Sequence, residues 1–291
     1  MISRLCLGTA QFGLEYGIAN RRGIVPQKEV FEIFKFAQRI GLKTLDTSIA
    51  YGDSERIIGE FIAETGIPFE IVSKILVDSD RFDPNDIRLK LQGSLQRLKV
   101  KQLYGCLIHR FEDFLKHDRL WGVLEASKKD GLIGKIGFSL YRPEDLGLIW
   151  DRGISFDIVQ VPFSVFDRRF EKELKLLKDK GVEIHVRSIF LQGLVFLNPD
   201  QLPDKLSQAS EPIQHLQRIS EKYNLSISAV CLNYVLLNPF VDKVLIGVDG
   251  LGHLKDNVRE LGALDKARGL KEELNNLAIA DEEVLLPFKW N

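Results

Sequence analysis

Four side chains suited to acid–base chemistry lie at or near the ends of apolar stretches. Asp46 and Lys74 fall within KTLDTS and EIVSKI, where an unpaired charge would be costly, so we expect them to pair if both face one pocket. Tyr51 follows in the next loop, and a nearby lysine ammonium is expected to lower the pKa of its phenol towards neutral pH. His109 would donate a hydrogen bond to a carbonyl oxygen. These residue types predict a centre that protonates a carbonyl group.

Eight short apolar runs alternate with amphipathic stretches and would position these side chains. The runs are continuous, as is typical of parallel strands covered on both faces, and they span 5–9, 44–47, 69–74, 104–109, 135–139, 157–163, 183–188 and 243–248. Helices are predicted at 28–40, 54–64, 84–98, 114–129, 143–151, 170–180, 226–237 and 251–261. The pattern predicts a single-domain (β/α)8 TIM barrel over residues 1–291, with an open doubly wound sheet as the alternative. Chemistry in such barrels sits at the C-terminal strand ends, where the four side chains fall.

Composition narrows the class of protein. The 291 residues carry 40 Lys+Arg against 41 Asp+Glu, which argues against a nucleic-acid partner, and 45% hydrophobic residues argue against disorder. No apolar run approaches the ~18 residues of a membrane span, and the N-terminus shows no signal peptide. Cys6, Cys106 and Cys231 are expected to be reduced, and the histidines lack metal-binding spacing. We therefore expect a soluble cytoplasmic protein without a metal site or a membrane partner.

Eight segments carry a family resemblance: LGTAQFG (7–13), LDTSIAYGDSERIIG (45–59), VSK (72–74), LIHR (107–110), IGFS (136–139), VQVPFS (159–164), RSIFLQGLV (187–195) and GVDGLGHLKDN (247–257). Through them the chain resembles the aldo-keto reductase superfamily over nearly its whole length. DTSIAYGDSE is the most specific segment, because it matches the family's Asp-(x)4-Tyr-Gly signature. The resemblance implies a (β/α)8 barrel that carries out NAD(P)H-dependent carbonyl reduction. Tyr51 would be the proton donor, Lys74 and Asp46 would tune it, and His109 would orient the substrate.

The resemblance also implies a bound NADP(H) or NAD(H). The positions that would hold it are Gly8, Thr9, Ser139, Gln160, Arg187, Ser188, Phe190, Leu191, Gly193, Val248, Asp249, His253, Asp256 and Asn257. Three positions at or beside this set depart from the family pattern. Leu140 replaces an asparagine beside the carboxamide, and Arg187 stands where many members stack an aromatic ring on the nicotinamide. Asp249 would repel a 2′-phosphate, which predicts relaxed or NAD-tolerant cofactor use.

The substrate and the biological role stay open at this point. Two long segments, 191–211 and the tail from residue 281, are expected to cover the substrate or to be disordered. Two arginines near the mouth, Arg110 and Arg187, allow an anionic or sugar-phosphate substrate. The first hypothesis is reduction of an aldehyde or ketone, including sugar derivatives. The alternatives are a cofactor-sensing regulatory subunit with little turnover and a sugar-modifying enzyme with tightly held nicotinamide. The oligomeric state is open.

Overall fold

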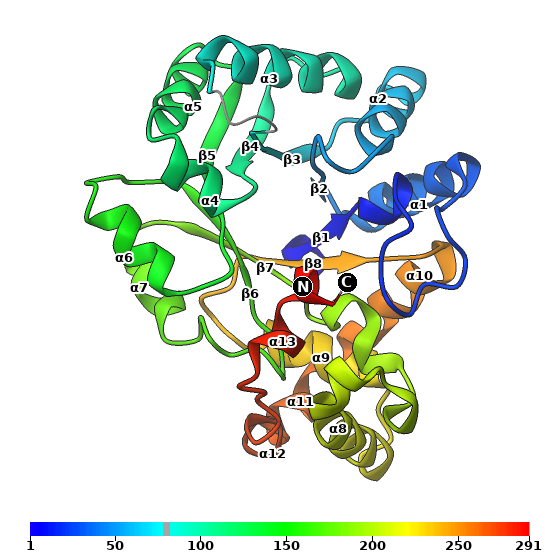
Figure 1. Ribbon diagram of the computed structural model, residues 1–291. Helices are drawn as coiled ribbons and strands as arrows, with labels where there is room; N and C mark the ends of the chain where they lie inside the picture. The colour runs from blue at the N-terminus through cyan, green and yellow to red at the C-terminus, as the bar shows by residue number, and fades with distance from the viewer. Residues whose placement is uncertain (78–81, 291) are drawn as a thin grey trace.

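Eight parallel strands close into a barrel in sequence order in the computed structural model, which describes residues 1–77 and 82–290 (Figure 1). The strands are β1 Leu5–Gly8, β2 Thr44–Asp46, β3 Glu70–Ile75, β4 Leu103–Ile108, β5 Ile133–Ser139, β6 Ile158–Pro162, β7 Glu183–Arg187 and β8 Lys243–Gly247. The barrel closes where β8 pairs with β1, from Leu5 opposite Val244 to Gly8 opposite Gly247. The predicted (β/α)8 barrel is confirmed, and the open-sheet alternative is excluded.

Side-chain size sets how closely the strands approach inside the barrel. Val72, Leu107 and Ile158 form a small buried apolar cluster there, separate from the main core between strands and helices. Gly137 lies against β6 so closely that a Cβ would come 1.6 Å from the carbonyl oxygen of Ile158. A side chain at that position would therefore push β5 away from β6, and glycine is required.

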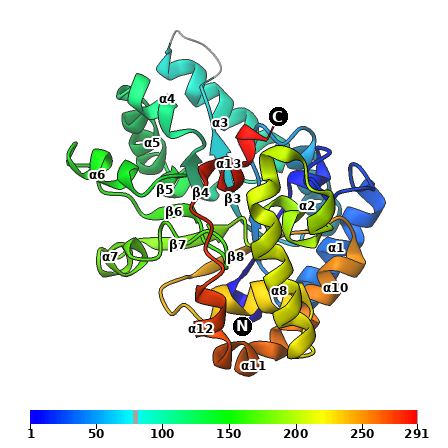
Figure 2. The ribbon, with the colours of Figure 1, turned by 60° about the horizontal axis from the view of Figure 1, so that its bottom comes forward.

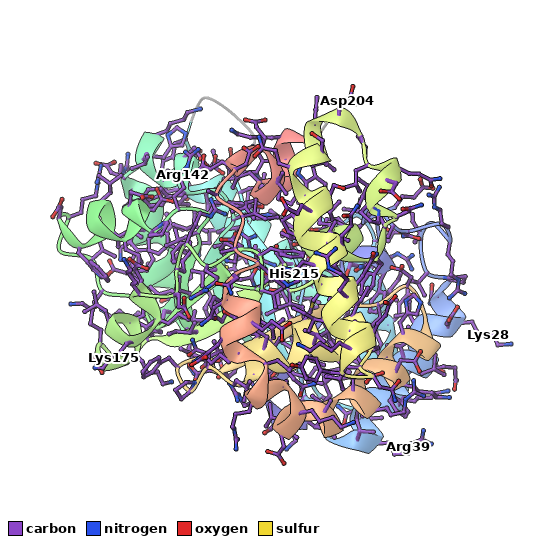
Figure 3. The ribbon with its side chains drawn as sticks, turned by 90° about the horizontal axis from the view of Figure 1, so that it is seen from below. Lys28, Arg39, Arg142, Lys175, Asp204 and His215 are labelled. Carbon is purple, nitrogen blue, oxygen red and sulfur yellow. The ribbon has the colours of Figure 1, made fainter. Side chains whose placement is uncertain are left out.

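Helices surround the barrel, and most bury one face against it. The principal ones are α1 Gln27–Ile40, α2 Ser54–Thr65, α3 Pro84–Leu98, α5 Arg119–Lys129, α6 Glu144–Trp150, α7 Glu173–Asp179, α9 Ile227–Leu236 and α10 Leu251–Glu260. Helix α9, by contrast, is buried on all sides along most of its length. Helix α3 begins as its sequence predicts, because Asp83 accepts a hydrogen bond from the Asn85 amide and Pro84 opens the first turn. Figure 3 shows Lys28, Arg39 and Lys175 projecting outward from the solvent faces of these helices.

Two predictions of secondary structure were wrong. The helix predicted at 114–129 is divided into α4 Phe111–Lys116 and α5, because the backbone at His117 leaves the helical region (φ −135°, ψ 76°). The segment 191–211 is not an irregular loop: it forms the short 3-10 helices Leu191–Phe196, Pro199–Gln201 and Asp204–Ala209 and leads into α8 Ser210–Lys222. Helix α8 buries Ile213, Leu216 and Ile219, a helical spacing that the sequence analysis overlooked.

The chain after α10 returns across the molecule through α11 Leu264–Gly269, α12 Lys271–Asn275 and α13 Glu282–Leu285. The N- and C-termini overlap in the view of Figure 1 and separate in Figure 2, where the C-terminus lies beyond α13 and the N-terminus on the opposite side. The tail from residue 281 is ordered here, and Leu285 and Leu286 are fully buried. Among the helices of the described residues, none is long and apolar enough to cross a membrane.

Candidate active site

The predicted pairing of Asp46 and Lys74 is present at the mouth of the barrel. Lys74 Nζ lies 2.6 Å from Asp46 Oδ1, and only 1% and 4% of the two side chains are exposed. The same ammonium donates to the Tyr51 hydroxyl at 3.4 Å and to the Thr47 carbonyl at 3.0 Å. Asp46 ends β2, Lys74 lies near the end of β3, and Tyr51 is in the loop before α2. The topology therefore gathers three of the four chemical side chains at one point.

The pKa of Tyr51 departs from the expectation. Burial, reinforced by the negative charge of Asp46, raises the pKa of the phenol well above its usual value. Lys74 does not reverse this direction, because its charge is compensated by Asp46 at contact distance. The expected lowering is wrong for this arrangement. The phenol is thus fully protonated at neutral pH, which is the form that a proton donor needs.

His109 completes the group as a neutral imidazole. Its ring meets the Tyr51 ring edge-on, with 5.9 Å between centroids. Burial, with the neighbouring charges of Lys74, Arg187 and Arg110, lowers the pKa of His109 to about 3. One ring nitrogen of a neutral histidine donates and the other accepts, so its neighbours decide which nitrogen carries the proton.

Ser48 supplies that neighbour and was not singled out from the sequence. Its Oγ lies 3.1 Å from His109 Nδ1 and accepts a hydrogen bond from the Ala50 amide, also at 3.1 Å. The Ser48 hydroxyl can donate either to the Lys74 carbonyl at 3.3 Å, which also accepts the Ile49 amide, or to His109 Nδ1. The contact with Nδ1 is the shorter of the two and favours the form of His109 that carries its proton on Nε2.

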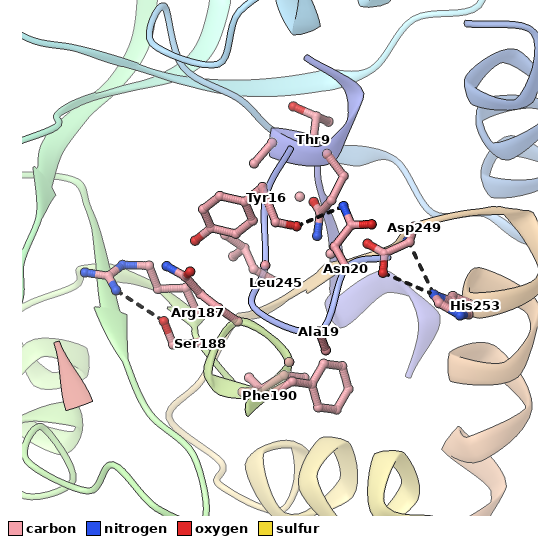
Figure 4. A pocket seen from close by; sticks show the side chains of 18 of the residues that line it. Thr9, Tyr16, Ala19, Asn20, Arg187, Ser188, Phe190, Leu245, Asp249 and His253 are labelled. Carbon is pink, nitrogen blue, oxygen red and sulfur yellow. Dashed lines mark hydrogen bonds and ion pairs between the residues drawn. The ribbon is translucent and has the colours of Figure 1, made fainter. Parts of the chain in front are cut away.

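A cavity of about 480 Å³ extends from Tyr51 and Asp46 towards the N-terminus of α10. Most of the residues expected to hold a cofactor line it: Gly8, Thr9, Gln160, Arg187, Ser188, Phe190, Gly193, Asp249, His253, Asp256 and Asn257. Ser139, Leu191 and Val248 are buried and lie outside this lining, and Lys74 and His109 are not among the lining residues either. Figure 4 shows the strand ends and the first loop converging on this cavity.

Several lining residues were not singled out from the sequence, among them Gln11, Tyr16, Asn20, Gln192 and Phe196. Gln11 lies within the matched segment 7–13, which was the signal available for it, whereas Tyr16 and Asn20 lie outside that segment. Gln160 was expected to contact the cofactor carboxamide, and its Nε2 also donates to Asp46 Oδ2 at 2.7 Å. Both carboxylate oxygens of Asp46 are thus engaged, one by Lys74 and one by Gln160.

The turn after β7 has the form of a backbone cradle beside the cavity. Ser188, Leu191, Gln192 and Gly193 all have positive φ, from 43° to 93°. A Cβ on Gly193 would lie 2.7 Å from the Ala19 Cβ, and the Ile18 amide donates to the Gln192 carbonyl at 3.0 Å. The turn therefore closes tightly against the loop after β1. A cavity of this length with a backbone turn along its wall fits a dinucleotide.

Negative charge gathers at the far end of the cavity. The Glu29 carboxylate of α1 accepts a hydrogen bond from the Leu251 amide at 3.0 Å, at the N-terminus of α10. Arg22 is held by Glu29 at 2.7 Å and donates to the Asp249 carbonyl at 2.7 Å. The Asp249 carboxylate lies 3.9 Å from His253 Nδ1. Two carboxylates thus occupy the helix end where an additional phosphate would otherwise be favoured.

Among residues 1–77 and 82–290, no group of three or more His, Cys, Asp and Glu side chains is arranged to hold a metal ion. The three cysteines are buried and unpaired. Cys106 packs in the main core on the outer side of β4, so it does not approach His109 as a nucleophile would.

The barrel and the residues at its mouth define the place where chemistry is expected, and comparison with known sequences identifies the family. The profile of the Aldo/keto reductase family matches residues 4–267, so the chain belongs to that family. It is 27% identical over 294 residues to YqkF, an uncharacterized oxidoreductase of Bacillus subtilis (strain 168), with 92% of each chain covered.

A second relative and a solved structure are also similar to this chain. The chain is 25% identical over 300 residues to the NADH-specific methylglyoxal reductase of Escherichia coli (strain K12), covering 89% of this chain and 90% of that one. The fold is shared with an aldo-keto reductase from Bacillus halodurans solved in its holo form, with a TM-score of 0.75 at 20% identity. That superposition covers 97% of this chain and 95% of the other.

Proposed function

We propose that this enzyme reduces the carbonyl group of an aldehyde or ketone, with Tyr51 as the proton donor. The observation that carries the proposal is the Tyr51 phenol held against the buried Lys74–Asp46 pair at one end of the cavity. A nicotinamide dinucleotide bound in that cavity would supply the hydride. Tyr51 then gives its proton to the carbonyl oxygen, and the resulting phenolate lies beside the Lys74 ammonium, which stabilises it.

His109 would orient the substrate rather than protonate it. With a pKa of about 3 the imidazole has no second proton to give at neutral pH. The Ser48 contact favours the proton on Nε2, from which a hydrogen bond to the carbonyl oxygen can be donated. The two donors would polarise the carbonyl as negative charge develops on its oxygen.

We further propose that the enzyme accepts NAD(H) and has at most a weak preference for NADP(H). Glu29 caps α10 and holds Arg22, so neither the helix end nor that guanidinium is free for a 2′-phosphate. The NADH specificity named for the Escherichia coli relative is in line with this proposal. A preference for NADPH above about a hundredfold in kcat/KM would contradict it.

Steady-state reduction of a panel of carbonyl compounds tests the function. Wild-type enzyme is expected to turn over, and Tyr51→Phe is expected to lose about 10²–10⁴-fold in kcat while keeping its Kd for NADH, measured by fluorescence quenching. Undiminished turnover in Tyr51→Phe would remove Tyr51 from the mechanism. Negligible wild-type turnover with intact cofactor binding would favour a cofactor-sensing role, and copurified dinucleotide would favour a tightly held cofactor.

A further inference from the structure

Arg187 places a positive charge on the cavity wall without a carboxylate to neutralise it. It ends β7 and lines the cavity together with Tyr51 and Asp46. None of the ion pairs found among residues 1–77 and 82–290 includes it. Arg110, the other arginine near the mouth, is bound to Asp113 at 3.1 Å and donates to the Val77 carbonyl at 2.6 Å. Of the two arginines, Arg187 is therefore the one available to an anion.

The guanidinium of Arg187 is also held in place before any ligand arrives. It stacks on the Tyr141 ring with its Cζ 3.9 Å from the centroid, and it donates to the Leu140 carbonyl at 2.9 Å and to Ser188 Oγ at 3.3 Å. A guanidinium has five N–H donors, and within the described parts of the chain these two bonds are the ones it makes. The remaining donors are available in a fixed geometry, which reduces the entropy lost on binding.

Tyr16 adds a second donor beside this group. Its side chain lines the same cavity, and Figure 4 shows its hydroxyl turned towards the side where Arg187 lies. No hydrogen bond to that hydroxyl is found within the described residues. Burial raises the pKa of Tyr16, so its phenol remains a donor at neutral pH.

The charges around the reaction centre leave this end of the cavity positive. Asp46 and Lys74 compensate each other at 2.6 Å, and His109 is neutral. The acidic lining residues Asp249 and Asp256 belong to the α10 end. A substrate group near Arg187 and Tyr16 would therefore meet one uncompensated cation and a free phenol.

We propose that Arg187 and Tyr16 form an oxyanion subsite next to Tyr51, so that the preferred substrates are carbonyl compounds carrying a carboxylate or a phosphate. This inference rests on the proposed carbonyl reduction at the same site. The anion would anchor the substrate in the ground state and the transition state alike, so its contribution should appear mainly in KM.

The test compares pairs of substrates that carry the same aldehyde and differ in the presence of an anionic group. Within each pair the anionic substrate is compared with its neutral counterpart: 4-carboxybenzaldehyde with 4-formylbenzamide, and glyceraldehyde 3-phosphate with glyceraldehyde. In at least one pair we expect kcat/KM to be about tenfold or more higher for the anionic substrate. Arg187→Gln should bring the anionic-to-neutral ratio of kcat/KM close to one, mainly because KM for the anionic substrate rises by about 10–100-fold relative to KM for its neutral counterpart in the same variant. Arg187→Lys should retain part of the advantage of the anionic substrates. Arg142→Gln is the matched control, since Arg142 is an exposed residue next to Tyr141 that pairs with Glu282.

Two binding measurements separate this inference from the function it rests on. Calorimetry should show benzoate binding at least tenfold more tightly than benzamide, with the difference lost in Arg187→Gln, whether or not any carbonyl is reduced. The Kd for NADH is measured in the same variant, because Arg187 is also one of the positions expected to hold the cofactor. If the enzyme turns over but benzoate and benzamide have the same Kd and the anionic and neutral substrates the same kcat/KM, the subsite is overturned. Carbonyl reduction would then still hold. A Kd for NADH that rises in Arg187→Gln with an unchanged substrate ratio would assign Arg187 to the cofactor and equally overturn the subsite.

Discussion

The barrel contains two clusters of tyrosine, lysine, carboxylate and histidine, one at each end of its strands. At the mouth they are Tyr51, Lys74, Asp46 and His109. At the floor, near the N-terminal ends of β4, β5 and β7, Tyr104 donates to Glu183 at 2.7 Å and Lys135 donates to Tyr104 at 2.8 Å, while Lys135 also contacts Glu183 directly. His185 completes the floor cluster, with Nε2 2.7 Å from Glu183. The same residue types thus occur twice in one barrel.

The two clusters differ in whether the tyrosine hydroxyl already donates its proton to the carboxylate. Glu183 receives hydrogen bonds from all three partners, so the Tyr104 proton is already committed. At the mouth Asp46 engages Lys74 and Gln160, and the Tyr51 hydroxyl is free to donate beside the cavity. The four floor residues lie outside the cavity lining. Residue types alone therefore do not define an active site: the Tyr51 phenol has a free donor beside the cavity, whereas the floor cluster lies away from it, although Nδ1 of His185 there has no hydrogen-bond partner among the described residues.

The largest expected contrast is between the two tyrosines. Tyr51→Phe should lose about 10²–10⁴-fold in kcat, and Tyr104→Phe should keep kcat within about twofold. Because Tyr104→Phe leaves a charged network one donor short, its Tm should fall by about 2–6 °C. Steady-state kinetics and thermal unfolding of both variants measure the contrast. A comparable loss of kcat in Tyr104→Phe would mean that the floor takes part in the chemistry.

The second contrast concerns the far end of the cavity. Glu29→Gln removes a charge from the N-terminus of α10 and releases Arg22, so the ratio of kcat/KM for NADPH to that for NADH should rise by about 10–100-fold. The Kd values for both cofactors, from fluorescence titration, should shift in the same sense. Glu32→Gln, on the same helix and in an exposed pair with Lys35, is the control and should change neither. An unchanged ratio in Glu29→Gln would show that another group excludes the 2′-phosphate.

The third prediction concerns the orientation of the His109 imidazole. Ser48→Ala removes the hydroxyl that favours the Nε2–H form of His109, so kcat should fall by about three- to tenfold with a smaller change in KM. Nitrogen-15 chemical shifts of the imidazole should report a mixture of tautomers in the variant. Ser48→Thr keeps the hydroxyl and should restore most of the rate. A wild-type tautomer in Ser48→Ala would assign the orientation of His109 to another contact.

The smallest effects are on stability in acid, and the two clusters should act in different pH windows. His109 has a folded pKa of about 3, below its unfolded value of 6.5, so folding loses stability as the pH falls below 6.5. Contacts with His185, Lys135 and Tyr104 outweigh burial and hold the pKa of Glu183 at about 2, so its contribution is lost as the pH falls from about 4.5 towards 2.

Denaturant titrations at several pH values separate the windows. His109→Asn should reduce the loss of unfolding free energy between pH 6.5 and 4.5 by about 1–2 kcal/mol. Glu183→Gln should be less stable at pH 7 and should lose less on further acidification below pH 4.5. If both variants followed the wild-type pH dependence, neither pKa shift would contribute to stability as the contacts imply.

Much of the barrel and the core of the site could be predicted from local pattern. Continuous apolar runs marked the eight strands, and the Asp-(x)4-Tyr-Gly spacing marked Asp46 and Tyr51. Helix α8 was missed although Ile213, Leu216 and Ile219 repeat at helical spacing, because no element was predicted between the long segment 191–211 and the helix at 226–237. Tyr16 was missed because one tyrosine in a loop has no local feature that shows which cavity it will line.

The sequence by itself determined the order of the strands, the identity of the four chemical side chains and their placement at strand ends, because these follow from short-range periodicity and spacing. The tertiary structure decided their electrostatics. The direction of the Tyr51 pKa depends on burial and on how Asp46 compensates Lys74 across β2 and β3. The Glu29 cap on α10 joins residues 222 positions apart, and the stacking of Arg187 on Tyr141 joins two different strand ends. Such contacts depend on closure of the barrel, which no local pattern encodes.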